Sequence, residues 1–420
     1  MATQTSSPTV IPSDAGLPTN KEFVQPQDIG IALFTGGFDK PYAFGLSMAL
    51  ASKNVCLNVI GSDEVDGPEM HTAPKLKFLN LQGSMEPADI TSKAFRILKF
   101  YARLFRYTAS TPARIFHILW NNKLQFFDRT FLMLYYKLLG KKIVFTAHNV
   151  NAGIRDGNDS FINQFSLRVQ YSLCDHIFVH TEKMKTQLLN DFNVDSLAVS
   201  VIPFGINHSV PDTDLTAVAA KRLLGIEDNA KTILFFGAIR PYKGLEYLVD
   251  AFFMLAERYP EYRLIVAGAG RKETEHYLIQ IQRTISNHPS EQRVIQNLQY
   301  ISDSQTELYF KAADLLALPY TEVFQSGVLF LSYSFGLPVV ATDVGSIGED
   351  IVEGKTGFLC KPRDPIDLAK AIEKYFESDL FKTLESQRSD IREYARERHS
   401  WELVGDMTRR VYVELLEAGK

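Results

Sequence analysis

Short runs of apolar residues alternate with longer segments of helical periodicity along most of this chain. In the first half, the runs occupy residues 29–34, 55–60, 115–119, 143–147, 177–179 and 201–203. In the second half, they occupy residues 232–236, 263–267, 315–318 and 339–341. Because the runs are continuously apolar and alternate with helix-length segments, they predict buried parallel strands in βαβ units. The pattern therefore predicts an α/β fold with two doubly wound parallel sheets.

Chain length and local composition indicate how these elements are divided. The 420 residues exceed what one hydrophobic core usually supports, so two domains of similar size are expected. Residues 1–27 are rich in Ser, Thr and Pro, and we expect them to form a disordered tail. We place a first domain at 28–206, a linker at 207–230 and a second domain at 231–400. The amphipathic pattern of residues 401–420 predicts a C-terminal helix.

The composition is that of an ordinary globular protein, with 45% hydrophobic and 22% charged residues. Lys or Arg interrupts every apolar stretch before it reaches the roughly 18 residues needed to cross a bilayer. Three widely separated cysteines with apolar neighbours suit free thiols in a reducing cytoplasm, so we expect a cytoplasmic protein. Residues 1–205 hold 20 Lys and Arg against 17 Asp and Glu, a net +3, and the remainder holds 25 against 32, a net −7.

Two basic amphipathic segments each allow two interpretations. Between residues 92 and 106, five Lys and Arg side chains are interleaved with aromatic and aliphatic ones, and residues 121–142 form a second such stretch. A helix of this kind can lie on an anionic membrane or can simply bury one face in the core, which is the commoner case. Peripheral contact with the inner face of the plasma membrane is therefore one expectation, and no nucleic-acid partner is indicated.

A cationic turn near the middle of the chain predicts an anion site. The apolar run 233–236 ends at Gly237, and Arg240 and Lys243 follow on a turn that leads into a helix. The helix is indicated by apolar residues at i, i+3, i+4 and i+7, namely Leu245, Leu248, Val249 and Phe252. Two cations beside the free N–H groups of a helix start suit a diphosphate better than a neutral ligand. We expect this turn to be exposed and to contribute little to stability.

A second polar loop, at residues 321–327, follows the predicted strand 315–318. Ser326 and Gly327 are placed to begin a helix with uncovered N–H groups, which can hold a phosphate. Glu322 adds a carboxylate that gains nothing from a phosphate but can accept a hydrogen bond from a sugar hydroxyl. The carboxyl ends of parallel strands meet at one edge of a sheet, so the loop and the turn are expected to face one cleft.

In this order, the motifs of the second half resemble the nucleotide-sugar half of retaining glycosyltransferases of family 4, which have the GT-B fold. The motifs are Gly237 with Arg240, Lys243 and Gly244; Ala313-Asp314; Leu318-Pro319; Glu322 with Ser326-Gly327; Gly336 to Thr342; and Gly345 with Glu349 and Gly357-Phe358. The resemblance covers residues 230–375. The first half matches more loosely, through Gly36-Gly37, Thr146-Ala147-His148, Cys174 to Ile177 and Ile202 to Gly205.

The resemblance implies a division of labour between two Rossmann-like domains. The first domain would bind a hydroxyl acceptor, which could be a glycan, a lipid-linked saccharide or a small molecule. The second would bind a UDP- or GDP-linked sugar, and the C-terminal helix would return to the first domain. The implied catalytic residues are His148, Arg240, Lys243 and Glu322. The implied donor-binding residues are Gly36, Gly37, Gly268, Gln325, Ser326, Gly327, Val328 and Glu349.

No cofactor other than the donor, and no metal, is implied by this resemblance. Cations and amide donors at a leaving diphosphate can take the place of a metal ion. Asp212 and Asp214 imitate a metal-binding Asp-x-Asp pair, but they lie in the expected linker and follow no buried strand.

The chain departs from the family pattern at one position. The second glutamate of the family's Glu-x7-Glu motif, which usually grips the ribose, falls near Phe330 counted from Glu322, or at Leu331 counted back from Gly336. Neither side chain accepts a hydrogen bond, so another group, for which we favour Glu349, is expected to hold the ribose. Two alternatives stay open: a nucleotide-sugar epimerase on the same architecture, and a non-catalytic partner of an active transferase.

Overall fold

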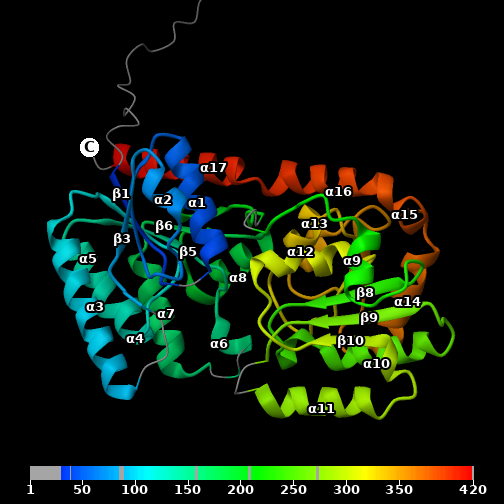
Figure 1. The fold of residues 1–420 in the computed structure, drawn as a ribbon. Coiled ribbons are helices and arrows are strands. Elements are labelled where there is room, and N and C mark those ends of the chain that lie inside the picture. The colour runs from blue at the N-terminus through cyan, green and yellow to red at the C-terminus, as the bar shows by residue number, and fades with distance from the viewer. Residues whose placement is uncertain are drawn as a thin grey trace, which may run out of the picture.

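The computed structural model describes residues 30–37, 39–84, 89–155, 157, 159–206, 210–270 and 274–418. These residues form two parallel sheets that lie side by side, each with helices on both faces (Figure 1). This is the doubly wound α/β architecture that the apolar runs predict. The tail expected at residues 1–27 lies outside the described residues.

The first sheet has seven parallel strands in the order β3-β2-β1-β4-β5-β6-β7. Their bounds are β1 Gly30–Phe34, β2 Cys56–Gly61, β3 Leu76–Asn80, β4 Ile115–Ile118, β5 Lys142–Thr146, β6 His176–Val179 and β7 Val199–Val201. Successive side chains of a strand point to opposite faces, so Ile31 and Leu33 enter one core while Ala32 and Phe34 enter another. Both faces are therefore covered, as the continuous apolar runs require.

The second sheet has six parallel strands in the order β10-β9-β8-β11-β12-β13. Their bounds are β8 Lys231–Phe236, β9 Tyr262–Ala267, β10 Val294–Asn297, β11 Leu315–Leu318, β12 Val339–Thr342 and β13 Gly357–Cys360. In both sheets the strand order reverses direction beside the first strand, β1 or β8, which opens a crevice at the carboxyl ends of the strands.

Helices connect the strands and cover the sheets. In the first half they are α1 Lys40–Ser52, α2 Pro68–Thr72, α3 Ile90–Ser110, α4 Gln125–Phe127, the π-helical η2 Asp128–Leu132, α5 Met133–Leu138, α6 Ala152–Arg155, α7 Phe161–Leu173, α8 Glu182–Phe192 and the short η3 Ser196–Ala198. Later ones are α9 Ala217–Leu223, η4 Pro241–Lys243, α10 Leu245–Ala256, α11 Glu275–Ser286, η6 Glu291–Arg293, α12 Asp303–Ala312, α13 Gly327–Ser334, η7 Ile347–Asp350, α14 Pro365–Glu377, α15 Asp379–Lys382, α16 Leu384–His399 and α17 Trp401–Glu417.

Three strands are absent from the predicted runs, and one further strand is shifted by two residues, whereas the other bounds agree to within one residue. The runs listed above omit β3, β10 and β13, all three of which lie at sheet edges, where polar residues are tolerated. The last strand of the first sheet is β7 at Val199–Val201, two residues earlier than expected, because its pairing with Ile177–Val179 of β6 sets its bounds.

The segment expected to be a linker contains structure of its own. Helix α9 packs against α12, and the buried Lys221 ammonium lies 2.9 Å from the Asp314 carboxylate. Ala220, Ile226 and Ala230 belong to the second core. The residues after 216 thus fold with the second sheet, because α9 carries apolar side chains that this core buries.

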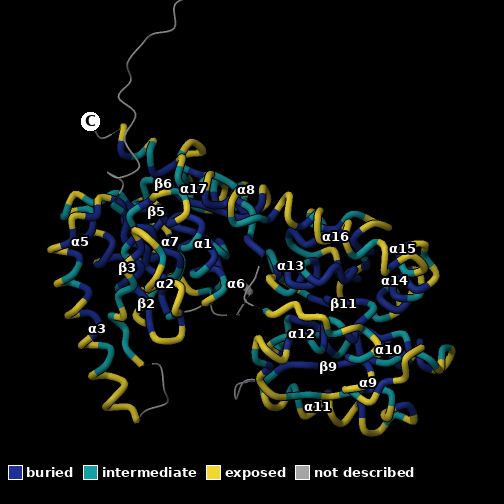
Figure 2. Tube along the Cα trace, turned by 45° about the horizontal axis from the view of Figure 1, so that its top comes forward, coloured by how far each residue is buried: buried dark blue, intermediate teal, exposed yellow. Residues whose placement is uncertain are grey.

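Helices α16 and α17 run along both halves of the molecule (Figure 1). The first of them packs against α13 and the second against α1. The Trp401 indole fills the space above Gly45 and Gly205, where an added Cβ would lie 2.0 and 2.4 Å from the ring, and its Nε1 donates to the Ile206 carbonyl at 2.7 Å. Both sheets are enclosed by these layers, and Figure 2 shows the strands as the buried interior of each half.

Candidate functional site

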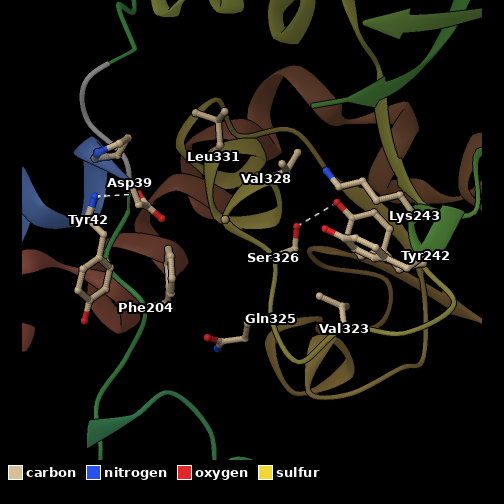
Figure 3. A pocket seen from close by; sticks show the side chains of 14 residues that line it. Asp39, Tyr42, Phe204, Tyr242, Lys243, Val323, Gln325, Ser326, Val328 and Leu331 are labelled. Carbon is tan, nitrogen blue, oxygen red and sulfur yellow. Dashed lines mark hydrogen bonds between the residues drawn. The ribbon is translucent and has the colours of Figure 1, made fainter. Parts of the chain in front are cut away.

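A cavity of about 320 Å³ lies between the two halves, at the carboxyl ends of their strands. Side chains of the first half face those of the second across it, with Asp39, Tyr42 and Phe204 on one side and Lys243, Ser326 and Val328 on the other (Figure 3). The other lining residues are Pro41, Gly205, Tyr242, Tyr320, Val323, Gln325, Gly327 and Leu331.

Lys243 is a buried cation in this cavity. It ends η4, and Gly244, with a φ of 64°, turns the chain into α10, whose predicted apolar stripe is fully buried. The side chain is only 8% exposed, and its ammonium lies 5.4 Å from the centre of the Tyr320 ring. Burial lowers the pKa of Lys243 below its ordinary value. Among the described residues the ammonium has no ion-pair or hydrogen-bond partner. A bound anion could therefore interact with it without displacing another group.

The depth of Lys243 corrects the expectation that both cations lie on an exposed turn. Tyr320 and α13 cover the lysine, which the local sequence cannot reveal. Arg240 begins the same turn but is only half-buried and does not line the cavity.

The start of helix α13 forms the wall beside Lys243. Ser326 is its N-cap, and Gly327 opens the helix with N–H groups that no preceding turn can satisfy. The Ser326 and Tyr320 hydroxyls lie 3.2 Å apart, which holds the serine against the cavity. Gln325, Ser326, Gly327 and Val328, all predicted from the sequence to bind the donor, are together here.

Apolar side chains occupy both positions at which the family's second glutamate was sought. Phe330 is buried and stacks on Phe204, with ring centres 5.7 Å apart, while Leu331 lines the cavity. The amide of Gln325 is the polar group nearby. Its Nε2 donates to the Asp350 carboxylate at 3.5 Å, and its Oε1 is buried without a partner among the described residues. Burial raises the pKa of Asp350 to about 7.

Glu322 lines a neighbouring cavity of about 330 Å³. Val323 lines both cavities, so the two adjoin. Across from the exposed Glu322 lie Asn149 and Gln187 of the first half. A ligand that crosses Val323 would therefore reach the lysine at one end and the glutamate at the other.

His148 lies between the residues that line the two cavities. Its ring stacks on Trp120 at 4.1 Å and meets the edge of Tyr42, which lines the first cavity, at 4.6 Å. The next residue, Asn149, lines the second cavity. Nδ1 of His148 is 3.0 Å from Nε2 of His180, and burial lowers the pKa of His148 well below its ordinary value.

Four other predicted donor-binding residues line neither cavity. Gly36 and Gly37 have φ values of 64° and 77°, and an added Cβ would lie 2.6 Å from Trp120 or 2.0 Å from Gln82. An added Cβ on Gly268 would lie 2.1 Å from the Gly237 carbonyl oxygen, so this glycine lets the backbones at the ends of β8 and β9 approach. Glu349 points to α8, with its carboxylate 4.0 Å from the Lys183 ammonium.

Sequence reasoning missed the aromatic side of the site. Tyr42, Phe204 and Tyr320 line the first cavity, and Asp39 caps helix α1 at its edge by accepting a hydrogen bond from the Tyr42 N–H at 3.2 Å. The only sequence feature that indicated it was the loose family match at residues 202–205. An aromatic residue in a loop after a strand is usually interpreted as part of the hydrophobic core.

Asp212 and Asp214, weighed above as a metal-binding pair, lie away from both cavities, and Asp212 pairs with Lys311 at 2.8 Å. Within the described ranges, no three His, Cys, Asp or Glu side chains gather closely enough to hold a metal ion. Nor is any helix in those ranges both long and apolar enough to cross a membrane.

Two family models match the chain, one for each half. The glycosyl transferases group 1 model matches residues 219–398, and the glycosyltransferase family 4 model matches residues 66–210. Together with the fold and the cleft, they define the class: this chain belongs to the family 4 glycosyltransferases with the GT-B fold.

Curated relatives are matched over part of their length. The D-inositol 3-phosphate glycosyltransferase of Corynebacterium jeikeium is 29% identical over 259 residues, which are 58% of this chain and 58% of that protein. The same-named protein of Nocardioides sp. is also 29% identical, over 58% of this chain and 55% of its own length. The chain thus spans somewhat more than half the length of these relatives.

Solved structures match over nearly the whole chain. Sucrose-phosphate synthase from Thermosynechococcus elongatus superposes with a TM-score of 0.74 at 18% identity, covering 93% of this chain and 99% of that one. HepE from Anabaena in complex with UDP superposes with a TM-score of 0.68 at 18% identity, covering 91% and 99%. At these identities the likeness establishes the shared fold.

Proposed function

We propose that this protein is a retaining, metal-independent hexosyltransferase that moves a sugar from a UDP- or GDP-linked donor to a hydroxyl acceptor. The observation that carries the proposal is the buried ammonium of Lys243, which has no partner in the described part of the chain and lies beside the start of helix α13 in the cleft between the halves. A cation without a counterion and a set of free N–H groups suit an anion that both contact.

The diphosphate is proposed to lie between Lys243 and the N–H groups of Ser326 and Gly327. When the bond from the anomeric carbon to the phosphate oxygen breaks, negative charge builds up on that oxygen. A preorganised cation and amide donors stabilise the charge, and such a donor is typically worth about 2.7–4 kcal/mol at the transition state. Arg240, on the same turn, adds positive charge at longer range.

The transferred sugar is proposed to extend past Val323 toward Glu322 and His148. The glutamate would accept a hydrogen bond from a sugar hydroxyl as the ring gains oxocarbenium character. For retention, the acceptor oxygen attacks the face from which the phosphate leaves. The leaving phosphate oxygen takes the acceptor's proton, so the step needs no separate base.

The names of the matched proteins support this donor and acceptor class. HepE was crystallised with UDP and with UDP-glucose, and the curated relatives are named for inositol 3-phosphate, a small hydroxyl compound. WaaG, a structural neighbour of TM-score 0.63, is described as acting in lipopolysaccharide biosynthesis. We therefore propose a glycan, a lipid-linked saccharide or a small molecule as the acceptor, and a cytoplasmic location.

Purified protein offered a panel of UDP- and GDP-linked sugars tests the proposal through release of UDP or GDP. Slow hydrolysis of one donor, accelerated by an acceptor, is the expected result, and the anomeric configuration of the product by NMR reports retention. Interconversion of the donor sugar without transfer would indicate the epimerase instead. Phe330 and Leu331 in place of a carboxylate favour the non-catalytic partner, for which no donor would be turned over.

The same panel tests the ribose contact. Glu349 remains the group proposed from the sequence, and Gln325 is the polar side chain that lines the cavity beside Leu331. UDP and 2′-deoxy-UDP binding by Glu349→Ala and Gln325→Ala, measured by calorimetry, distinguishes them. The variant that loses the preference for the ribose hydroxyl identifies its acceptor.

A membrane contact is proposed at the outer face formed by α3, α4, η2, α5 and α7. Residues 90–170 hold 13 Lys and Arg against 3 Asp and Glu in a chain of net charge −4. Exposed apolar side chains gather on the same elements and, at Leu124, just before α4: Ile90, Phe95, Leu98, Leu124, Phe126, Phe131, Leu134, Leu138, Phe161, Ile162 and Phe165. Figure 2 shows the first turns of α3 exposed at the edge of the molecule. Positive charge and apolar side chains together suit an anionic lipid surface.

Cosedimentation with vesicles tests this contact. The unaltered protein should sediment with phosphatidylglycerol vesicles and not with phosphatidylcholine vesicles. The double variant Phe95→Ser, Leu98→Ser should lose binding, whereas Leu223→Ser, at an equally exposed leucine of the second half, should keep it. Equal binding by all three proteins would contradict the proposed face.

A further inference from the structure

Two histidines at neighbouring strand ends are connected by hydrogen bonds beside the cleft. His148 follows β5 and His180 follows β6. Nδ1 of His180 is 3.1 Å from the carbonyl oxygen of Ile202, and Nε2 of His180 is 3.0 Å from Nδ1 of His148. The three groups form one line from the backbone after β7 to His148, which packs against Tyr42 of the first cavity and precedes Asn149 of the second.

This line determines where each proton lies. A carbonyl oxygen only accepts, so Nδ1 of His180 must donate to Ile202. A neutral imidazole carries a single N–H, so Nε2 of His180 has a lone pair and must accept from His148. The proton of His148 is therefore on Nδ1, and its Nε2 is left as a hydrogen-bond acceptor.

Both rings are neutral near pH 7, as this assignment requires. Burial is the main cause: it lowers the pKa of His180 to about 4 and that of His148 well below its ordinary value. Electrostatic repulsion from another histidine nearby lowers each pKa further.

The acceptor nitrogen of His148 has no partner within the described residues. Nε2 is buried and makes no hydrogen bond there, although the residue as a whole is half-buried. Tyr42, against which the ring packs, lines the first cavity, and Asn149 lines the second. A buried acceptor without a donor is unfavourable and gains from a ligand that supplies one.

We infer that His180, anchored by the Ile202 carbonyl, holds His148 in the Nδ1–H tautomer, so that Nε2 of His148 accepts a hydrogen bond from a hydroxyl of the transferred sugar. This role rests on the proposed function. A phosphate oxygen cannot take this role, because an ionised phosphate oxygen only accepts hydrogen bonds, as Nε2 of His148 does. A sugar hydroxyl can donate one. His148 is then a substrate-binding residue, and His180 is a positioning residue that acts through it.

The tautomer is measured without substrate by long-range proton–nitrogen correlation NMR on protein labelled with [¹⁵N]histidine. His148→Gln identifies the His148 signals by their loss. The expected spectrum of the unaltered protein has a protonated Nδ1 and an unprotonated Nε2 at His148. A proton on Nε2 would overturn the inference.

Variants at position 180 separate positioning from packing. His180→Phe keeps the bulk but removes the acceptor, so the His148 proton should move from Nδ1 to Nε2. His180→Gln keeps an amide oxygen for His148 and an N–H for Ile202, and should restore the Nδ1–H form. His176→Phe changes another buried histidine, at the opposite end of the same strand, and should leave the His148 signals unchanged. Thermal unfolding of each variant identifies any that has lost its fold.

Turnover of UDP-glucose and GDP-mannose, the two probe donors, tests the role at the sugar. Loss of one hydrogen bond predicts a kcat/KM lower by about three- to tenfold in His180→Phe, with His180→Gln and His176→Phe within about twofold of the unaltered protein. Unchanged kcat/KM in both His180→Phe and His148→Gln would overturn the sugar contact. If the unaltered protein turns over neither these donors nor the wider panel, the proposed function fails and the sugar contact fails with it, while the NMR result still decides the tautomer.

Discussion

Replacing Lys243 with methionine removes the charge of the cleft while keeping most of the side-chain volume. Lys243 is 8% exposed, and its ammonium has no partner among the described residues. If it holds the diphosphate, its loss should cost about 2.7–4 kcal/mol in the transition state, a hundred- to thousandfold fall in turnover. The fold should not suffer, because the substitution removes a buried charge whose desolvation no partner among the described residues offsets.

Chemical unfolding with and without UDP measures both effects in one assay. A ligand at 100 times its Kd stabilises the folded state by about 2.7 kcal/mol. If Lys243→Met weakens UDP binding about a hundredfold, the same UDP concentration equals the new Kd, and the stabilisation falls to about 0.4 kcal/mol. GDP replaces UDP in this assay if the donor panel favours it.

Lys221→Met is the matched control, since Lys221 is as buried as Lys243 but pairs with Asp314 at 2.9 Å. That substitution leaves a buried carboxylate unpaired and should lower the unfolding free energy by about 3–5 kcal/mol. The stabilisation by added UDP should stay the same. If UDP raises the unfolding free energy of Lys243→Met as much as that of the unaltered protein, the anion site is refuted. A loss of stability like that of Lys221→Met would show that Lys243 is a structural lysine.

Three further outcomes are expected. Arg240→Ala should lower turnover at least about tenfold and change the unfolding free energy by no more than about 0.5 kcal/mol; unaltered turnover would remove this arginine from the site. Transfer should continue in excess EDTA, and a strict need for magnesium or manganese would contradict the proposed mechanism. Burial raises the pKa of Asp350 from an ordinary 3.8 to about 7. The folded protein therefore holds this proton more tightly than the unfolded chain does. The resulting contribution to the unfolding free energy is fully present below about pH 4 and is lost as the pH rises through 7. Asp350→Asn should therefore flatten the pH dependence of the unfolding free energy across this window, and an unaltered slope in denaturant titrations would count against the raised pKa.

Local pattern was enough for the elements whose burial is visible in their own sequence. Strand β8 and helix α10 were predicted because a continuous apolar run and a stripe of period 3.6 each define a buried surface without reference to the rest of the chain. The same holds for Gln325 to Val328, because a polar loop after a buried strand necessarily emerges at the carboxyl edge of the sheet.

The sequence by itself thus determined the fold class, the cationic turn and the polar loop, since each is encoded by neighbours along the chain. The edge strands β3 and β10, and the depth of Lys243, were decided by the tertiary structure. The lysine is buried because the Tyr320 ring and helix α13 fold over it from a distant part of the chain. The line from Ile202 through His180 to His148 likewise joins the ends of three strands. Such contacts depend on which strands the sheet places side by side, and no local pattern encodes that order.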